Sequence, residues 1–397
     1  MQKGHQVAQG KTKVLYEHDG QPDVLVVAQL DTISAGDGAR RNEIPGKGRI
    51  AAKTTARVFR LLNLCGLPTH FLSGGEDDDD NEMLVRRCTM LPLEVVVRGV
   101  AAGSLVKRRP GISRGALLIP RMIEFFYKDD AQHDPLIEPD AIVAQGIASP
   151  GDIALMSEVA RLTYEILAHA WRRHQTLLVD LKIEFGRITS GEGKGNLIIA
   201  DVIDNDSWRV WPQAREELML DKQVYRNLAE VTASDLDAIK HNYEMVAEQV
   251  GEFTQMKPGM VAMFAANPGE DARFASLARS LQSIGLPSLR HVTSPAQTPG
   301  YVLQLVQQLD ATFGRLVYVT MSEGSSLFAM VDAATPNVVV EAGEDTATML
   351  ACAKPLAIDD TVLYGRTLLA QANARSTVLQ ADAALQAPPG VPAHTHA

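Results

Sequence analysis

The chain contains 397 residues and carries 38 Lys and Arg against 48 Asp and Glu, a formal net charge of −10, so it is longer than one ordinary domain and lacks the basic surface of a general nucleic-acid binder. Its 46% hydrophobic and 22% charged residues are typical of a soluble globular protein, which argues against a long disordered chain and against a fibre. The sequence has no run of 18 apolar residues, no apolar signal-peptide core and no disulfide or zinc spacing among its three cysteines, so we expect a cytoplasmic protein that does not enter a membrane.

Short strand-like runs dominate the first hundred residues. Five of them are rich in β-forming residues and end at Gly, Asp or Pro, namely residues 13–16, 24–28, 70–73, 82–85 and 94–98. One helix is predicted among them, over residues 51–64, because Val58, Leu61 and Leu62 recur at helical spacing.

A longer helical pattern covers residues 153–171. Ser149 is its expected N-cap, with Pro150 at the first helical position and Asp152 in the first turn. Strands are expected at residues 177–185 and 197–202, followed by a helix over residues 235–252 with Ser234 as its cap. Because strands and helices do not alternate regularly, residues 1–255 are predicted to form an α+β domain.

The pattern changes at residues 256–259, which we interpret as a linker. From residue 260 to 385, short apolar strands alternate with helices, beginning with VAMFAA at residues 261–266. The further strands are expected at residues 289–292, 316–320 and 337–341, with helices at residues 271–284, at residues 300–313 and after residue 320. This alternation predicts an α/β domain with a doubly wound parallel sheet. The Pro-rich residues 386–397 are expected to form a disordered tail.

The segment LVDLKIEFG, residues 178–186, concentrates charge on one face of a predicted strand. Because side chains alternate along a strand, Asp180, Lys182 and Glu184 share a face opposite an entirely apolar one. This pattern indicates the wall of a site, although a half-exposed edge strand would show the same alternation.

The glycine-rich sequence GEGKGN, residues 191–196, predicts a hairpin between this strand and the next. A turn centred between Glu192 and Gly193 places Glu184 opposite Asp201. Two facing carboxylates repel each other. A hard cation such as Mg²⁺, with nucleotide phosphates as further ligands, would relieve that repulsion.

Other segments also combine charges with turn residues. In GKTK, residues 10–13, Lys11 and Lys13 share a strand face and Gly10 allows a ligand to approach the backbone, but the spacing is not that of a P-loop. Four further polar clusters beside apolar strands are typical of ligand-binding loops: residues 31–41, 95–111, 125–135 and 200–212.

In their order along the chain, these motifs resemble those of the phosphoribosylaminoimidazole-succinocarboxamide (SAICAR) synthetases. The similarity spans residues 8–255 and runs from GKTK through VVVRGVAAGS, FYKDD, KIEFG and DVIDNDSWR to DKQVYR. DVIDNDSWRVWP and DKQVYRNLAEVT are most similar to the animal bifunctional enzymes, which add an aminoimidazole ribonucleotide (AIR) carboxylase domain. The resemblance implies an ATP-binding fold of antiparallel sheets and helices. It also implies a ligase of purine biosynthesis that joins carboxyaminoimidazole ribonucleotide (CAIR) to L-aspartate with ATP and Mg²⁺.

The resemblance also implies roles for individual residues. It assigns ATP binding to Gly10, Lys11, Lys13, Arg87, Glu94, Glu184 and Asp201, with Glu184 and Asp201 also holding Mg²⁺ and residues 87–94 supplying the adenine hinge. The expected substrate ligands are Asp31, Ser34, Gly36, Asp37, Arg98, Ser104, Lys128, Asp129, Asp130, Asp134, Asp206, Ser207, Arg209, Lys222 and Arg226. Asp180, Lys182 and Arg98 are expected to assist catalysis, in which the CAIR carboxylate becomes an acyl phosphate that the aspartate amine attacks.

The second domain departs from the carboxylase pattern. The phosphate loop of that family is replaced by FAANPGED at residues 264–271, and its catalytic histidine motif by SPAQ at residues 294–297. We therefore expect no carboxylase activity and a role in homo-oligomer assembly. The alternatives are a bifunctional enzyme that uses other residues and a non-catalytic scaffold, whereas a protein kinase is disfavoured because HRD and DFG motifs are missing from the sequence.

Overall fold

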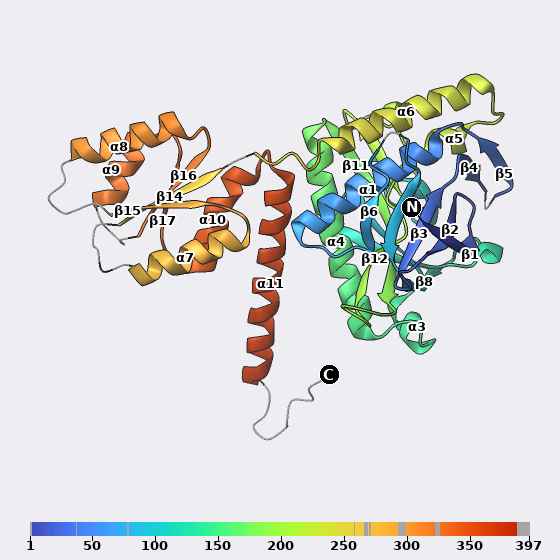
Figure 1. Ribbon diagram of the computed structural model, residues 1–397, viewed down its shortest axis with the longest axis horizontal. Coiled ribbons are helices and arrows are strands. Elements are labelled where there is room, and N and C mark those ends of the chain that lie inside the picture. The colour runs from blue at the N-terminus through green and yellow to red at the C-terminus, as the bar shows by residue number, and fades with distance from the viewer. Residues whose placement is uncertain are drawn as a thin grey trace. The chain divides into compact units, whose positions relative to one another are not determined.

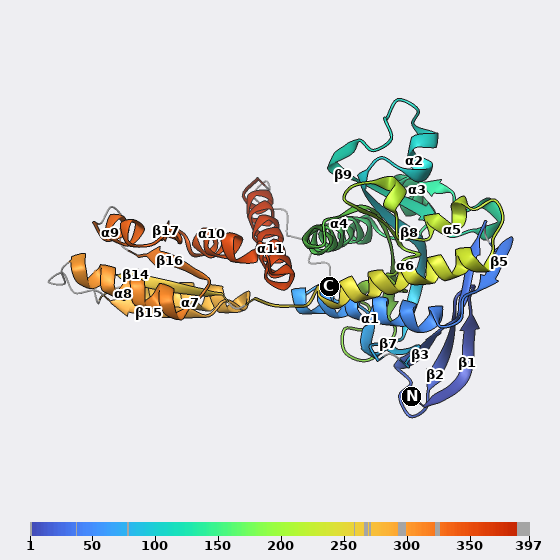
Figure 2. The same ribbon diagram turned by 90° about the horizontal axis from the view of Figure 1, so that it is seen from above.

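The computed structural model describes residues 2–36, 38–77, 79–257, 259–265, 269, 271–292, 299–321 and 326–386. The chain divides into two compact units, Met1–Gln255 and Met256–Ala397, which Figures 1 and 2 show from two directions. Among the described residues, no helix is both long and apolar enough to cross a lipid bilayer.

The first unit begins with a five-stranded antiparallel sheet. Its strands are β1 (Lys3–Gln9), β2 (Lys13–His18), β3 (Val24–Gln29), β7 (Glu82–Arg86) and β6 (Phe71–Gly74), in that spatial order. A separate hairpin joins β4 (Thr32–Ala35) to β5 (Arg40–Glu43). The sheet is apolar at its centre, since every residue of β3 is buried.

A second antiparallel sheet forms the other half of this unit. Its order is β10 (Leu136–Ile137), β9 (Leu117–Tyr127), β8 (Cys88–Val100), β11 (Thr176–Ile188) and β12 (Leu197–Ala200), and β13 (Trp208–Pro212) also pairs with β11. The charged strand of the sequence is therefore the centre of the sheet, so the alternative of a half-exposed edge strand is wrong. The hairpin of β11 and β12 is confirmed, but Glu184 pairs with Ala200 and not with Asp201. The predicted register was wrong by one residue.

Three long helices support the sheets. Helix α1 (Lys47–Cys65) lies beside α6 (Ala233–Gly251), and α4 (Pro150–Arg173) packs on β11 (Figure 1). The capping box of Ser149 and Asp152 confirms the predicted start of α4. Helix α6 instead begins after Thr232, whose side chain accepts the Asp235 N–H, so the assignment of Ser234 as the cap was wrong. The short helices are α2 (Gly103–Arg108), η1 (Asp130–Gln132), α3 (Pro139–Ala144), η2 (Glu216–Leu218) and α5 (Gln223–Asn227).

The second unit contains a four-stranded parallel sheet, as its sequence predicts. Its order is β15 (Ser288–Val292), β14 (Met260–Ala265), β16 (Leu316–Thr320) and β17 (Val338–Glu341). The helices are α7 (Asp271–Ser283), α8 (Pro299–Thr312), α9 (Ser326–Ala334), α10 (Asp345–Ala357) and α11 (Thr361–Gln386).

Both faces of β14 are buried against helices. Val261 and Met263 join a core with α7 and α10, whereas Ala262 and Phe264 join another with α8 and α9. The SPAQ segment, Pro268 and the tail from residue 387 lie outside the described residues, so the expectations for them remain predictions.

Candidate active site

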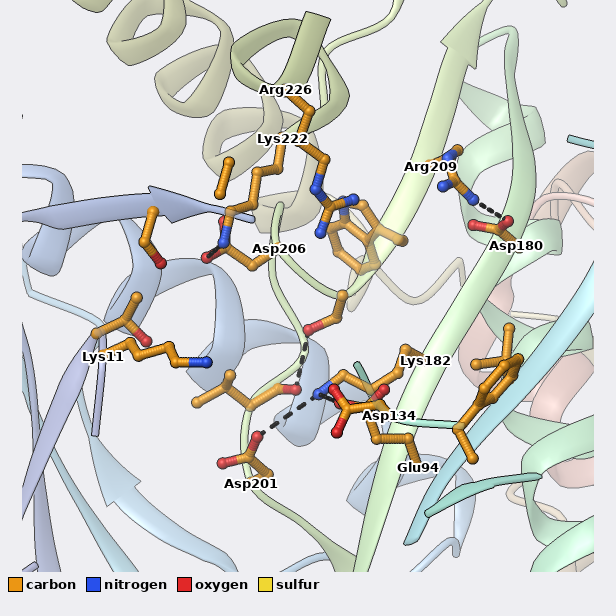
Figure 3. Close-up of a pocket in the computed structure, with 18 of the residues that line it drawn as sticks. Lys11, Glu94, Asp134, Asp180, Lys182, Asp201, Asp206, Arg209, Lys222 and Arg226 are labelled. Atoms are coloured by element: carbon orange, nitrogen blue, oxygen red, sulfur yellow. Dashed lines mark hydrogen bonds and ion pairs between the residues drawn. The ribbon is translucent and has the colours of Figure 1, made fainter. Parts of the chain in front are cut away.

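A pocket of about 520 Å³ opens in the first unit. In Figure 3, Lys182, Glu94 and Asp201 gather at one end, whereas Lys222 and Arg226 lie at the other. The pocket brings together these predicted residues: Lys11, Lys13, Ser34, Gly36, Glu94, Arg98, Ser104, Asp134, Asp180, Lys182, Asp201, Asp206, Ser207, Arg209, Lys222 and Arg226. They come from β2, β4, β8, α2, β11, β13, α5 and several loops, so residues far apart in the sequence meet in one space.

Lys182 stands at the centre of an acidic group on the pocket wall. Its Nζ lies 2.6 Å from Glu184 Oε1, 3.4 Å from Glu94 Oε1 and 3.9 Å from Asp201 Oδ2. Burial disfavours the charged form of this lysine, but Glu184 and Glu94 outweigh burial and raise the pKa of Lys182 above its ordinary value. Lys182 is therefore a cation near neutral pH, suited to neutralising a substrate's charge and not to removing a proton.

Glu184 lies behind Lys182 and is only 3% exposed. Its two oxygens accept hydrogen bonds from Lys182 at 2.6 Å and from Lys128 at 2.5 Å. Burial opposes ionisation of this carboxyl, but the two lysines lower the pKa of Glu184 to about 2. Glu184 is thus an anion near neutral pH, next to the lining residue Lys182.

Asp201 forms an ion pair with Lys13, and both residues line the pocket. Its backbone is left-handed, with φ of 67°, directly after the end of β12. Asp tolerates this conformation better than most residues do, and the turn carries the carboxylate toward Lys182 although Asp201 is outside the strand. The sequence could not show this turn.

The carboxylates suit a magnesium ion if a nucleotide supplies further ligands. Mg²⁺ binds through one or two carboxylates together with phosphate oxygens and waters. Among the described residues, no cluster of three or more His, Cys, Asp or Glu forms a complete metal cage. Glu184 and Asp201 would be the protein ligands, and both are now neutralised by lysines that a phosphate group could also engage.

An arginine group forms another wall of the pocket. Asp180 Oδ2 accepts a hydrogen bond from Arg98 NH1 at 3.1 Å and another from Arg209 NH1. Arg98 is 3% exposed, and it also contacts Ser104 Oγ at 3.4 Å. Gly103 has a φ of 57°, which L residues rarely adopt, and a Cβ atom there would lie 2.6 Å from the Arg209 guanidinium, so glycine is favoured at this position.

A third group surrounds Asp206. Its carboxylate accepts hydrogen bonds from Lys222 Nζ at 2.9 Å and from the Tyr243 hydroxyl at 3.0 Å. Lys47, which is 2% exposed, lies over the Tyr243 ring. Although burial opposes ionisation, Lys47 and Lys222 lower the pKa of Asp206. The neighbouring Asp204 has a raised pKa, because it is buried beside the charged Asp206.

Several predicted residues do not line the pocket. Asp31 accepts hydrogen bonds from the Gly46 and Gly48 N–H groups at the start of α1, and Arg87 pairs with Glu17. The residues that lie off the lining are Gly10, Asp31, Arg87, Lys128, Asp129, Asp130 and Glu184. Lys128 and Asp130 still adjoin it, through Glu184 and through Lys11, which lies 2.8 Å from Asp130. Asp37 is outside the described residues.

The pocket also contains residues that lie within the motifs but were given no individual role. Thr12, Val96, Phe126 and Trp208 line it. Val96 and Phe126 could have been found from strand alternation, since Val96 lies two residues from both Glu94 and Arg98, and Phe126 pairs with Glu94. The sequence alone, however, does not show which residues of β8 and β9 pair with each other.

The second unit places a small aromatic group at one end of its sheet. Phe264 is fully buried, with its ring 5.6 Å from that of His291, and Tyr301 stacks on His291, with ring centroids 6.1 Å apart. Burial lowers the pKa of His291. The loops that follow β14, β15 and β16 fall largely outside the described residues.

Comparisons with known proteins identify the family of the first unit. A family model described as SAICAR synthetase matches residues 6–243. A protein of Roseiflexus sp. (strain RS-1) named phosphoribosylaminoimidazole-succinocarboxamide synthase is 48% identical over 249 residues, which is 63% of this chain and 97% of the relative. Among solved structures, a SAICAR synthetase in complex with ADP has a TM-score of 0.54 and 32% identity, covering 61% of this chain and 96% of the other.

A further relative extends past the first unit. It is the bifunctional phosphoribosylaminoimidazole carboxylase/phosphoribosylaminoimidazole succinocarboxamide synthetase of Drosophila melanogaster, 35% identical over 343 residues, which is 85% of this chain and 78% of the relative. Because the first unit ends at Gln255, this similarity continues into the second unit.

Proposed function

The chain belongs to the SAICAR synthetase family, and on that premise we propose that its first unit joins CAIR to L-aspartate with ATP, giving SAICAR, ADP and phosphate. The observation that carries this proposal is the single pocket whose walls hold an acid–lysine group and an arginine group. Both groups suit the reaction, since a phosphoryl group passes from ATP, whose phosphates lysines neutralise, to the carboxylate of an anionic ribonucleotide, which arginines attract.

We place the ATP phosphates at Lys11 and Lys13. The ADP complex of a structural relative supports a nucleotide in this fold. Mg²⁺ held by Glu184 and Asp201 would neutralise charge on the transferred phosphoryl group. Lys182 pairs with carboxylates in this structure. A bound phosphoryl group would compete with those carboxylates, and Lys182 could then contact the phosphoryl oxygens.

We place the ribonucleotide at Arg98, Ser104 and Arg209, with Lys222 and Arg226 nearby. Guanidinium groups are the natural partners of phosphate and carboxylate oxygens, because they bind them with two parallel hydrogen bonds. Arg209 lies across the pocket from Lys11 in Figure 3, and Arg98 and Ser104 line the same pocket, so the two substrates would meet between these groups.

The proposed chemistry has two steps. A CAIR carboxylate oxygen attacks the γ-phosphorus of ATP, the bond to ADP breaks, and an acyl phosphate forms. The aspartate amine then attacks the acyl carbon, loses a proton and displaces phosphate. Both steps depend on positioning and on neutralised charge, so no nucleophile from the protein is needed.

For the second unit we propose a role in assembly and no carboxylase activity. AIR carboxylation needs a group that transfers a proton near neutral pH. His291 contacts the rings of Phe264 and Tyr301, and its lowered pKa reflects burial, which suits a packing role. The similarity to the bifunctional Drosophila protein keeps carboxylation as the second candidate.

Two assays of the purified chain distinguish these functions. Incubation with CAIR, aspartate and Mg-ATP should give SAICAR with matching release of ADP, and incubation with AIR and bicarbonate should give no CAIR above background. A chain that does not form SAICAR would contradict the synthetase proposal. Carboxylation that is lost in His291→Ala would contradict the proposed role of the second unit.

A further inference from the structure

A buried carboxylate that no motif identified, Glu124 on β9, lies beside the arginine group of the pocket. Arg98 on β8 lies directly opposite Asp180 of β11. Glu124 is the diagonal neighbour of Arg98 on the other side, because it pairs with Val96. Since alternate residues share one face of a sheet, the two carboxylates flank Arg98 on the face that lines the pocket.

Glu124 uses both of its oxygens to hold arginines. Oε2 accepts a hydrogen bond from Arg98 Nε at 2.6 Å, and Oε1 accepts one from Arg108 NH2 at 2.6 Å. The residue is 7% exposed. Burial opposes its ionisation, but the two arginines lower the pKa of Glu124, so it is an anion that bridges the sheet to helix α2.

Arg98 is held from three directions. Its Nε contacts Glu124, its NH1 contacts Asp180 and its NH2 contacts Ser104. A guanidinium with fixed partners on several edges has one orientation. Two of its five N–H donors are not used in these contacts, and Arg98 lines the pocket.

Ser104 depends on the same arginines. Its Oγ accepts hydrogen bonds from Arg98 NH2 at 3.4 Å and from Arg108 NH1 at 2.9 Å. A hydroxyl oxygen has two acceptor sites and one hydrogen to donate. With both acceptor sites taken, the hydrogen remains for an acceptor in the pocket that Ser104 lines.

The charges of this group favour an anionic ligand. Three guanidiniums, those of Arg98, Arg108 and Arg209, share the two carboxylates of Glu124 and Asp180. One positive charge is therefore in excess, in a partly buried setting that strengthens its attraction for an anion.

We propose that Glu124 is a positioning residue for the anionic ribonucleotide, because its carboxylate fixes Arg98 and, through Arg108, the Ser104 hydroxyl. The inference rests on the proposed function, since it assumes that this wall of the pocket binds CAIR. Glu124 acts through these residues and does not itself line the pocket.

The test compares Glu124→Gln with wild type and with a matched control. Gln cannot accept at both terminal atoms as Glu124 does, because one of them is an NH2 group that would face an arginine donor. We expect KM for CAIR to rise about 10- to 100-fold, the effect of losing a charge-assisted contact, while KM for ATP stays within about threefold. Glu165→Gln removes another carboxylate–arginine pair at β9, 2.9 Å from Arg121 and away from this pocket, and it should leave both constants unchanged.

Glu124→Asp keeps the charge and shortens the side chain, so it should give a smaller rise in KM for CAIR. This variant decides the question if Glu124→Gln does not fold. A carboxylate that only stabilises the fold would lower the melting temperature without separating the two KM values. Unchanged KM for CAIR in both folded variants, or in Glu124→Asp alone if it is the one that folds, would overturn the inference.

Calorimetric binding of CAIR, without ATP or aspartate, separates this inference from the proposed function. Wild type that binds CAIR without forming SAICAR would contradict the proposed reaction, and weaker binding by the variants would still support the role of Glu124. Wild type that does not bind CAIR would overturn both.

Discussion

The surroundings of Lys13 disfavour the protonated, charged form of its side chain. Burial lowers the pKa of Lys13 to about 8, Glu184 works against that effect, and Lys182 and Lys128 add to it. Between pH 8 and the ordinary value of 10.5, the unfolded chain therefore binds more protons at this residue than the folded chain does. The contribution of Lys13 to the free energy of unfolding thus rises with pH in that window.

Binding of ATP should have the opposite pH dependence. If charged Lys13 meets the phosphates, kcat/KM for ATP in wild type should fall above about pH 8, approaching tenfold per pH unit. Lys13→Arg keeps its charge in this range, so its kcat/KM for ATP should fall less steeply. Steady-state profiles from pH 7 to 9.5 measure both, and parallel profiles would show that the charge of Lys13 does not govern ATP binding.

Glu184 should be indispensable for the nucleotide complex. Glu184→Gln removes a carboxylate that faces two lysines, so it loses both the charge that would hold Mg²⁺ and the orientation of Lys182. We expect turnover to be abolished, together with the Mg²⁺-dependent part of the melting shift that ATP produces.

The measurement can follow tryptophan fluorescence, because the three tryptophans, Trp171, Trp208 and Trp211, all lie in the first unit. Glu158→Gln, which breaks a surface pair with Arg161 on α4, is the control and should behave as wild type. A normal rate and a normal shift in Glu184→Gln would remove Glu184 from the metal site.

At the scale of an element, the start of α6 depends on one side chain. Thr232 accepts the Asp235 N–H, and the Asp235 carboxylate accepts the Thr232 N–H in return. Losing such a cap typically costs about 1 kcal/mol. Thr232→Ala should therefore lower the free energy of unfolding of the first unit by about that amount, as measured by urea titration of tryptophan fluorescence.

Ser234→Ala is the matched control, since Ser234 lies two residues further along, within the helix. It should change stability by less than about 0.5 kcal/mol. If Ser234→Ala were the more harmful of the two changes, the helix would begin where the sequence first suggested.

The hairpin of β11 and β12 shows how far an element can be predicted. The glycine-rich turn and the two β-forming runs identified the hairpin, because each signal is local. The register depends on the number of residues in the loop, which glycines leave free, and a register shift of one residue moves Asp201 from a paired position into a left-handed turn. The carboxylates still meet at Lys182, which no count along the strands could predict.

Long-range side-chain partners were the least predictable part of the site. Arg98 was identified by its motif, but its partner Glu124 lies 26 positions away on a strand that the sequence analysis did not name. Only the pairing of β8 with β9 brings the two together. The resemblance therefore predicted residues that line the pocket, such as Arg98. The structure adds the partners, such as Glu124, that fix the orientation of those residues.

For the whole molecule, alternation of strands and helices predicted the parallel sheet of the second unit. Each helix must return the chain to the same end of the sheet, so the pattern leaves few other folds. The loops that would carry chemistry there lie largely outside the described residues. The residues to which the proposed chemistry is given all lie in the first unit.

The division into two units predicts that the first unit can catalyse the reaction alone. All residues that line the pocket, from Lys11 to Arg226, belong to the first unit, and the Roseiflexus relative has almost no length beyond it. A fragment of residues 1–255 should therefore retain kcat/KM for CAIR within about threefold, a difference of less than about 1 kcal/mol in activation free energy. If the second unit joins subunits, the fragment's mass in solution, measured by light scattering, should fall by more than the mass of the chain removed. A fragment that folds but loses turnover would show that the second unit supports the site, and a mass reduced only by the deleted residues would contradict its role in assembly.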